Sequence, residues 1–231
     1  MPDNTTPAGA ARRRAGPAGS SGAMDHPVAL ISGASRGIGK VIARQLAAVG
    51  LTVHVGSGDA ARGQRAAADI AADIAGDARL LVLETTADQE NLATFRIYET
   101  NVCGVVAVTN AFLPALRRSA HPRIVNISSG TGSLAWATGP QFAHRGSYAA
   151  YRSSKAALNA LTVFYADALA GDGVKVNALA PGLRRTGLNA TAAASDGDPA
   201  QAAAGAVRLA LLPDEGPSGE FFSWDGTPVP W

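Results

Sequence analysis

Residues Val28–Gly39 read VALISGASRGIG, an apolar run that leads directly into a glycine-rich turn. A helical pattern begins at Ile38 and continues with apolar residues at Val41, Ile42 and Leu46. Glycines let the backbone turn tightly, and the free N–H groups at the start of a helix attract phosphate. Such turns also join strands to helices for purely steric reasons. We predict a strand, a turn and a helix here, and interpret the turn as a candidate pyrophosphate site for a dinucleotide.

Short apolar runs alternate with amphipathic helical patterns along most of the chain. The clearest helical patterns after the first lie at Phe95–Leu113 and Leu158–Leu169. Apolar strands that alternate with helices are typical of a parallel sheet covered on both faces. The sequence therefore predicts an α/β fold with a doubly wound parallel sheet in three layers. Strands are predicted at residues 28–32, 51–55, 79–83, 123–128, 175–180 and 220–224.

The beginning of the chain differs in composition from the rest. Residues 1–25 are mainly Ala, Gly, Pro, Ser and Arg, and few of them are large and apolar. Arg12–Arg14 would suit a targeting signal, but no hydrophobic segment follows them. We expect a disordered tail over residues 1–25 and a single domain over residues 26–231.

Composition narrows the class of protein. With 47% hydrophobic and 16% charged residues, the 231-residue chain is expected to be globular. Its net charge of +2 gives no reason to expect nucleic acid or an acidic membrane as a partner. Cys103 is the only cysteine, so no internal disulfide can form, and a cytoplasmic location is expected. The four histidines are scattered along the chain, and no metal site is predicted.

Tyr151 and Lys155 stand four residues apart at the start of a predicted helix. Positions i and i+4 share one helical face. An ammonium near a phenol favours the phenolate and lowers a pKa that is ordinarily about 10. The tyrosine could then exchange a proton with a carbonyl or an alcohol near neutral pH. A core tyrosine and a solvated lysine would have the same spacing, so the pair alone is a weak indication.

Three further segments strengthen this interpretation. Residues 123–129 read RIVNISS, a strand that ends in serines; Asn101 lies in the helical stretch YETNV; and residues 176–182 read VNALAPG. Together with the glycine turn and Tyr151, these segments follow one another in the order typical of the short-chain dehydrogenase/reductase family. The chain resembles that family from about Val28 to Trp231. The segment between Ser129 and Tyr151 and the C-terminal stretch resemble the carbonyl-reductase branch most. The resemblance implies a Rossmann-like fold.

The resemblance also implies roles for individual residues. Ser129 would hydrogen-bond the substrate oxygen, with Ser128 as the second choice. Tyr151 would exchange the proton, Lys155 would hold the cofactor ribose, and Asn101 would support a relay water. The predicted cofactor-binding residues are Gly33, Ser35, Arg36, Gly37, Ile38, Gly39, Tyr151, Lys155, Pro181, Gly182 and Thr186.

The end of the second predicted strand bears on the choice of cofactor. Relatives that use NAD usually have an acidic residue there, but the strand ends in Val55–Gly58 with no carboxylate before Asp59. Arg36 could bind the 2′-phosphate of NADP instead. It could equally be an exposed loop cation with no ligand. We therefore predict NADP, with NAD as the alternative.

The resemblance further predicts an internal deletion. Between the third strand and Asn101 the family normally has a helix, a fourth strand and an Asn-Asn-Ala-Gly motif, whereas Leu83–Glu90 passes almost directly into the Asn101 helix. The shortfall is roughly thirty residues, one βα unit. Glu84 stands where the family usually has an aspartate near the adenine. The absent strand would lie centrally, between the two halves of the site, so the sheet would either close up by about one strand spacing, 4.7–4.9 Å, or stay open with unpaired backbone groups. We predict weak or absent activity unless another segment fills the slot.

Taken together, the motifs favour an NAD(P)H-dependent oxidoreductase acting on a small carbonyl or alcohol. A dinucleotide-binding relative without turnover is the alternative, and a poorly folding deletion product is a third hypothesis. The segment with Trp136, Phe142 and His144 would either shape the substrate entrance or form a plain surface loop. The oligomeric state is left open, and a homo-oligomer is compatible with the sequence.

Overall fold

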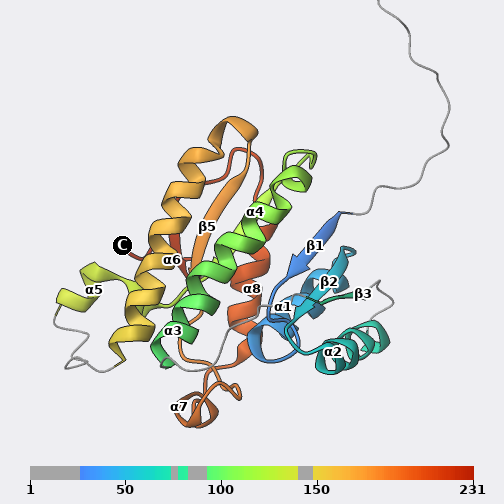
Figure 1. Ribbon diagram of the computed structural model, residues 1–231, viewed down its shortest axis with the longest axis horizontal. Helices are drawn as coiled ribbons and strands as arrows, with labels where there is room; N and C mark the ends of the chain where they lie inside the picture. The colour runs from blue at the N-terminus through green and yellow to red at the C-terminus, as the bar shows by residue number, and fades with distance from the viewer. Residues whose placement is uncertain (1–26, 74–77, 83–92, 140–147) are drawn as a thin grey trace, which may run out of the picture.

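The computed structural model describes residues 27–73, 78–82, 93–139 and 148–231 (Figure 1). Some of the expectations above fall elsewhere. The predicted tail over residues 1–25, the passage Leu83–Glu90 with Glu84, and both Phe142 and His144 lie outside the described residues.

Six described strands form within two residues of the predicted apolar runs, and all pair in parallel. Helices lie between successive strands, and the predicted α/β class is confirmed. The strands are β1 (Val28–Ile31), β2 (Thr52–Ser57), β3 (Ala78–Val82), β4 (Arg123–Ile127), β5 (Lys175–Ala180) and β6 (Phe221–Ser223). The helices are α1 (Gly37–Ala48), α2 (Ala60–Asp73), α3 (Ala93–Tyr98), α4 (Gly104–Leu116), α5 (Leu134–Thr138), α6 (Ala149–Ala168), α7 (Ala190–Ala193) and α8 (Pro199–Ala210), with the short turns η1 (Glu99–Cys103), η2 (Gly130–Gly132) and η3 (Ala170–Asp172).

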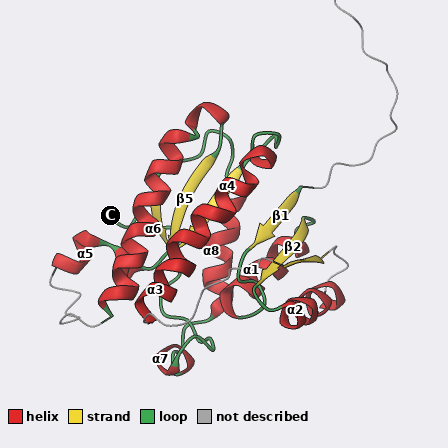
Figure 2. Cartoon of the chain, viewed as in Figure 1, coloured by secondary structure: helices red, strands yellow, loops and turns green. Residues whose placement is uncertain are grey.

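The described strands form two three-stranded sheets, ordered β1-β2-β3 and β4-β5-β6. In Figure 1 the first sheet lies with α2 on the right, and the second lies with α4 and α6 on the left. Figure 2 shows α4 and α6 over one side of β5, while α8 lies on the other. Helices thus cover both sides of a Rossmann-like arrangement.

The two halves are joined through α1 and α8, which lie between them (Figure 1). One apolar core runs across this contact, with Leu46 from α1, Val55 from β2, Leu179 from β5 and Leu209 from α8, all buried. Because a buried leucine or valine contributes about 1.5–3 kcal/mol, this shared core holds the halves against each other.

The two strands at the facing edges of the sheets are less buried than their neighbours. Val28 in β1 is 64% exposed, whereas Val53 and Val55 in β2 are fully buried. Most of β4 is half-buried, whereas β5 is buried over all but its first residue. In each sheet the middle strand, β2 or β5, is thus the well-buried one, and β1 and β4 are open edge strands.

Candidate active site

The glycine turn has the backbone that a phosphate loop needs. Gly33 and Gly37 have φ values of +66° and +56°, a region that favours glycine. A Cβ on Gly39 would lie 2.7 Å from the carbonyl oxygen of Gly33, so only glycine lets α1 approach the turn this closely. The N–H of Ala34 donates to the carbonyl of Gly56 in β2 at 3.0 Å. The turn is therefore fixed in place at the carboxyl end of its sheet.

The start of α1 is open to a ligand. Its N-cap residue, Arg36, is exposed and makes no side-chain capping hydrogen bond, so the first N–H groups of the helix are not capped from that side. Ser35 and Ile38, which were predicted to flank the cofactor, are half-buried on either side of it. This arrangement fits the pyrophosphate of a dinucleotide.

The loop after β5 reaches the glycine turn from the other half of the molecule. A Cβ on Gly37 would lie 3.8 Å from both Cβ and Cγ2 of Thr186. Pro181 and Gly182 begin this loop, and Gly182 has a φ of +68°. Two predicted cofactor segments, far apart in the sequence, therefore meet where the strands end.

Tyr151 lies in the first turn of α6, half-buried, and contacts Ser129. Burial raises the pKa of Tyr151, and a hydrogen bond with Ser129 acts in the opposite direction. Ser129 Oγ also lies 2.9 Å from Thr131 Oγ1. Ser128 instead is buried and donates to Asn159 Oδ1 at 2.5 Å. Of the two candidate serines, Ser129 is thus the one beside the phenol.

Lys155 follows Tyr151 by one helical turn, but its ammonium is held by the main chain. Its Nζ donates to the carbonyl oxygen of Ile127 at 2.8 Å and lies 5.8 Å from the centroid of the Tyr151 ring. Burial lowers the pKa of Lys155 to about 8. The expected lowering of the tyrosine pKa is not seen, because burial of the phenol raises that pKa by more than the hydrogen bond with Ser129 lowers it.

The carbonyl that Lys155 binds lies on the open edge of β4. The N–H of Ser128 donates to Leu179 in β5 at 2.8 Å. In a parallel pair, alternate residues direct their N–H and C=O groups to opposite edges. Ile127 therefore points its carbonyl away from β5, at the unpaired edge of β4. The lysine satisfies an acceptor that a neighbouring strand would otherwise pair.

The titration of Lys155 makes the free energy of unfolding depend on pH. The folded chain loses the lysine proton near pH 8, whereas an unfolded lysine keeps it to about 10.5. Between these values the unfolded state binds more protons, so stability rises with pH. Below pH 8 both states are protonated and the slope disappears. Urea unfolding at several pH values should therefore give a steeper alkaline rise for the wild type than for Lys155→Met. Parallel curves for the two proteins would contradict this assignment.

Asn101 lies in the π-helical turn η1 between α3 and α4. Its Nδ2 donates to Ser154 Oγ at 3.0 Å, and Ser154 Oγ donates to the carbonyl of Tyr151 at 2.7 Å. Such π-turns often occur at functional sites, because they redirect side chains. Asn101 is therefore fixed against the helix that carries Tyr151 and Lys155.

The residues bearing on the choice of cofactor lie as follows. Ser57 ends β2 and is buried, with its Oγ donating to the carbonyl of Asp59 at 2.8 Å. The pKa of the Asp59 carboxyl is lowered, first by a hydrogen bond from the Arg62 N–H. Arg36 forms no ion pair with the part of the chain that the structure describes. Arg36 is exposed at the start of α1.

The sequence does not mark Arg184, which the structure buries beside Trp224 in the loop after β5. A charged residue three positions after a proline would ordinarily be read as exposed. Contacts with Trp224 and with Gln201 in α8, both distant in the sequence, hold the side chain inward.

The sequence predicts neither a membrane partner nor a metal site, and the described residues bear on both expectations. Within them, no helix is long and apolar enough to cross a membrane. Among the same residues, no group of three or more His, Cys, Asp or Glu side chains could hold a metal.

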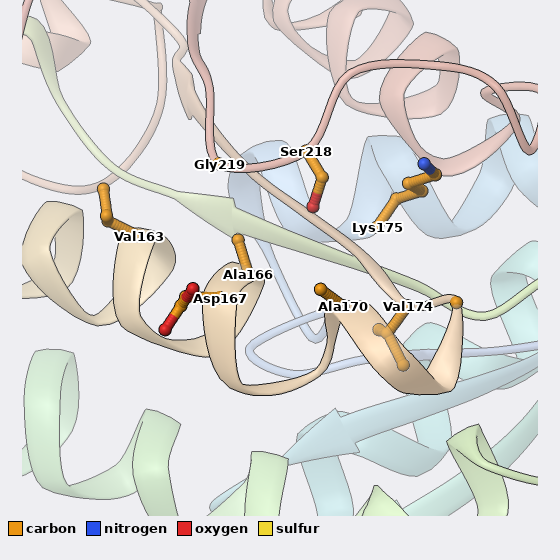
Figure 3. A pocket seen from close by; sticks show the side chains of 9 residues that line it. Val163, Ala166, Asp167, Ala170, Val174, Lys175, Ser218 and Gly219 are labelled. Carbon is orange, nitrogen blue, oxygen red and sulfur yellow. The ribbon is translucent and has the colours of Figure 1, made fainter.

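A pocket among the described residues is lined by none of these site residues (Figure 3). It measures about 400 Å³ and lies beside the C-terminal half of α6 and the first residue of β5. Its lining includes Val163, Ala166, Asp167, Lys175 and Ser218. The predicted site instead lies where β4 and β5 end.

Comparison with known proteins agrees with this arrangement. Residues 82–197 match the short chain dehydrogenase family. The short-chain dehydrogenase anuI of Penicillium roqueforti is 31% identical over 204 aligned positions, covering 71% of this chain and 81% of that protein. The (-)-isopiperitenone reductase of Mentha piperita is 36% identical over 160 positions, covering 54% of this chain and 50% of that enzyme. A solved Pseudomonas aeruginosa RhlG/NADP active-site complex has a TM-score of 0.72 at 26% identity, covering 88% of this chain and 96% of that one.

A Rossmann-like fold with a glycine turn after its first strand, and with a tyrosine, a serine and a lysine gathered at the start of α6, defines an oxidoreductase that uses a nicotinamide cofactor. The chain belongs to the short-chain dehydrogenase/reductase family.

Proposed function

We propose that the chain is an NADPH-dependent reductase of small carbonyl compounds. The observation that carries the proposal is the contact between Tyr151 and Ser129, with Lys155 one helical turn away. When bound, NADPH supplies a hydride to the carbonyl carbon. Tyr151 donates the proton to the carbonyl oxygen, and Ser129 orients and polarises that oxygen. Lys155 holds the ribose, and Asn101 fixes the relay water near the lysine.

The glycine turn and the loop after β5 hold the cofactor in this proposal. Gly33, Gly37 and Gly39 give the pyrophosphate access to the first N–H groups of α1, flanked by Ser35 and Ile38. Pro181, Gly182 and Thr186 receive the nicotinamide end. The contact between Gly37 and Thr186 supports this pairing, because one extended ligand would touch both.

NADP is preferred over NAD because of Arg36. Its exposed guanidinium stands at the helix start, and β2 ends in Ser57 with no carboxylate to bind the ribose hydroxyls. We expect Arg36→Ala to weaken NADPH binding about tenfold, in line with the loss of one charged hydrogen bond, and to leave NADH binding unchanged. Thermal shifts measured with both cofactors check this. An equal loss for both would contradict a contact with the 2′-phosphate.

We further propose that one βα unit is absent between β3 and Asn101. The 71% of this chain that aligns with anuI is about 164 of its 231 residues, against 204 aligned positions. About 40 aligned positions therefore have no residue of this chain opposite them. The two separate sheets and the open edges of β1 and β4 are also what a lost central strand would leave.

The break between the sheets favours a second candidate function, in which the chain binds a dinucleotide with little or no turnover. The attachment of Lys155 to Ile127 supports it, because that contact competes with the ribose for the same ammonium. A displacement of about 1 Å can cost about a hundredfold in rate. Residues 26–231 would still act as one domain in this case, and a cytoplasmic location suits both candidates.

One titration separates the candidates. The purified chain is titrated with NADPH and NADH, and thermal shift and carbonyl-dependent oxidation are followed together. A ligand at about 100 times its Kd stabilises by about 2.7 kcal/mol. Stabilisation with turnover supports the reductase, and stabilisation without turnover supports the binding protein. A chain that neither cofactor stabilises contradicts both.

A further inference from the structure

Arg184 lies in the loop that follows β5, two residues after Gly182, and is only 8% exposed. Its Nε donates to the carbonyl oxygen of Pro181 at 2.7 Å, and its Nη1 donates to Gln201 Oε1 in α8 at 3.2 Å. The guanidinium carbon lies 4.3 Å from the centroid of the Trp224 ring, just after β6. One side chain thus connects the loop to a helix and to a strand end.

The guanidinium also supports the backbone at Gly182. A Cβ on Gly182 would lie 3.3 Å from Nη2 of Arg184 and 3.4 Å from Cδ1 of Trp224. Nη2 itself is buried and has no hydrogen-bond partner among the described residues. Burying an unpaired donor costs free energy. The other contacts of the Arg184 guanidinium must therefore offset that cost and hold the guanidinium in this position. Stacking on an indole is among the stronger of these.

The far end of the loop is held separately. The N–H of Arg185 donates to the carbonyl of Gly197 at 2.8 Å, and Ser195 Oγ donates to the carbonyl of Leu183 at 3.2 Å. Thr186 then lies against Gly37. Arg184 is therefore the side-chain anchor of the end of the loop that bears Pro181 and Gly182.

We propose that Arg184, stacked on Trp224, is a positioning residue that fixes Pro181 and Gly182 for the nicotinamide end of the cofactor. The inference rests on the proposed function. Arg184 touches neither the glycine turn nor Arg36 in the contacts described. Its effect is confined to the nicotinamide half of the ligand, and the adenosine half is bound without it.

The test compares two ligands that differ in the nicotinamide end. NADPH contains the nicotinamide ring, whereas the second ligand, ADP-ribose 2′-phosphate, lacks that ring. Arg184→Met should weaken NADPH about tenfold, the size of one lost stacking and hydrogen-bonding anchor, and leave the shorter ligand within about twofold. Trp224→Leu should give the same selective loss to a smaller degree. Arg185→Met removes an exposed neighbouring charge and should change neither affinity.

Unchanged binding of the shorter ligand also shows that each variant is folded. Equal losses for both ligands, or no loss of NADPH affinity in Arg184→Met, would overturn the role of Arg184. Equal affinities of the wild type for the two ligands would also overturn it, because the loop would then hold no nicotinamide. A wild type that binds neither ligand contradicts the proposed function itself, which is a distinguishable result.

Discussion

Tyr151→Phe is expected to abolish most carbonyl-dependent oxidation of NADPH. A positioned general acid contributes about 10²–10⁴-fold to the rate, and phenylalanine keeps the ring while removing the only proton that the residue can donate. Because the phenol is largely buried and phenylalanine keeps its ring, the change preserves most of the packing. The measurement is kcat/KM with saturating cofactor.

Cofactor affinity serves as the control for this variant. The Tyr151 hydroxyl makes one of many contacts that the proposed site offers to the ligand, so NADPH should still stabilise Tyr151→Phe against heat. Tyr148→Phe is a matched change three residues earlier, at an exposed phenol, and should leave the rate unchanged. Full turnover by Tyr151→Phe would remove this tyrosine from the proton-transfer role.

Gly39→Val is expected to reduce cofactor affinity by more than about a hundredfold. The added Cβ would meet the Gly33 carbonyl oxygen at 2.7 Å and its carbonyl carbon at 3.1 Å, and both are backbone atoms that cannot rotate away. The turn must shift, and the N–H groups of α1 then no longer converge on one phosphate. Each charged hydrogen bond lost costs about 1.5–3 kcal/mol, and tenfold in affinity corresponds to about 1.4 kcal/mol.

Gly171→Ala is the matched control, because a Cβ there meets no atom within 4 Å. Isothermal titration with NADPH should give a wild-type affinity for Gly171→Ala and weak or undetectable binding for Gly39→Val. Far-ultraviolet circular dichroism checks that both variants retain the fold. Wild-type affinity in Gly39→Val would mean that the cofactor is not held by this turn.

The alternation of apolar runs was sufficient to predict the α/β class and the strand positions, because buried parallel strands need continuous apolar stretches. The glycine turn was readable for a similar reason, since few residues adopt φ values such as that of Gly37. The assignment of site residues to roles rested on the family resemblance and stays a prediction.

Other features depend on contacts between distant segments, which no local pattern encodes. The attachment of Lys155 to Ile127 requires the open edge of β4, and the inward turn of Arg184 requires Trp224 from the far end of the chain. The π-turn at Asn101 leaves no periodicity in so short a segment. For the same reason, the predicted loss of a strand stays a prediction, and the sequence left open whether the remaining strands would close up into one sheet or stay apart, whereas the described strands form two sheets.

The contact between α1 and α8, which connects the two halves of the molecule, has a consequence for local unfolding. The contacts between its halves are concentrated in α1 and α8, and Gln45 donates across them to the carbonyl of Ala200 at 3.2 Å. Regions joined by one interface tend to open as separate cooperative units, each with its own free energy. A dinucleotide that contacts both Gly37 in one half and Thr186 in the other would stabilise the two halves against separate opening. Amide hydrogen exchange should then show two phases without the ligand, one for each half, and a single, slower phase when the dinucleotide is bound.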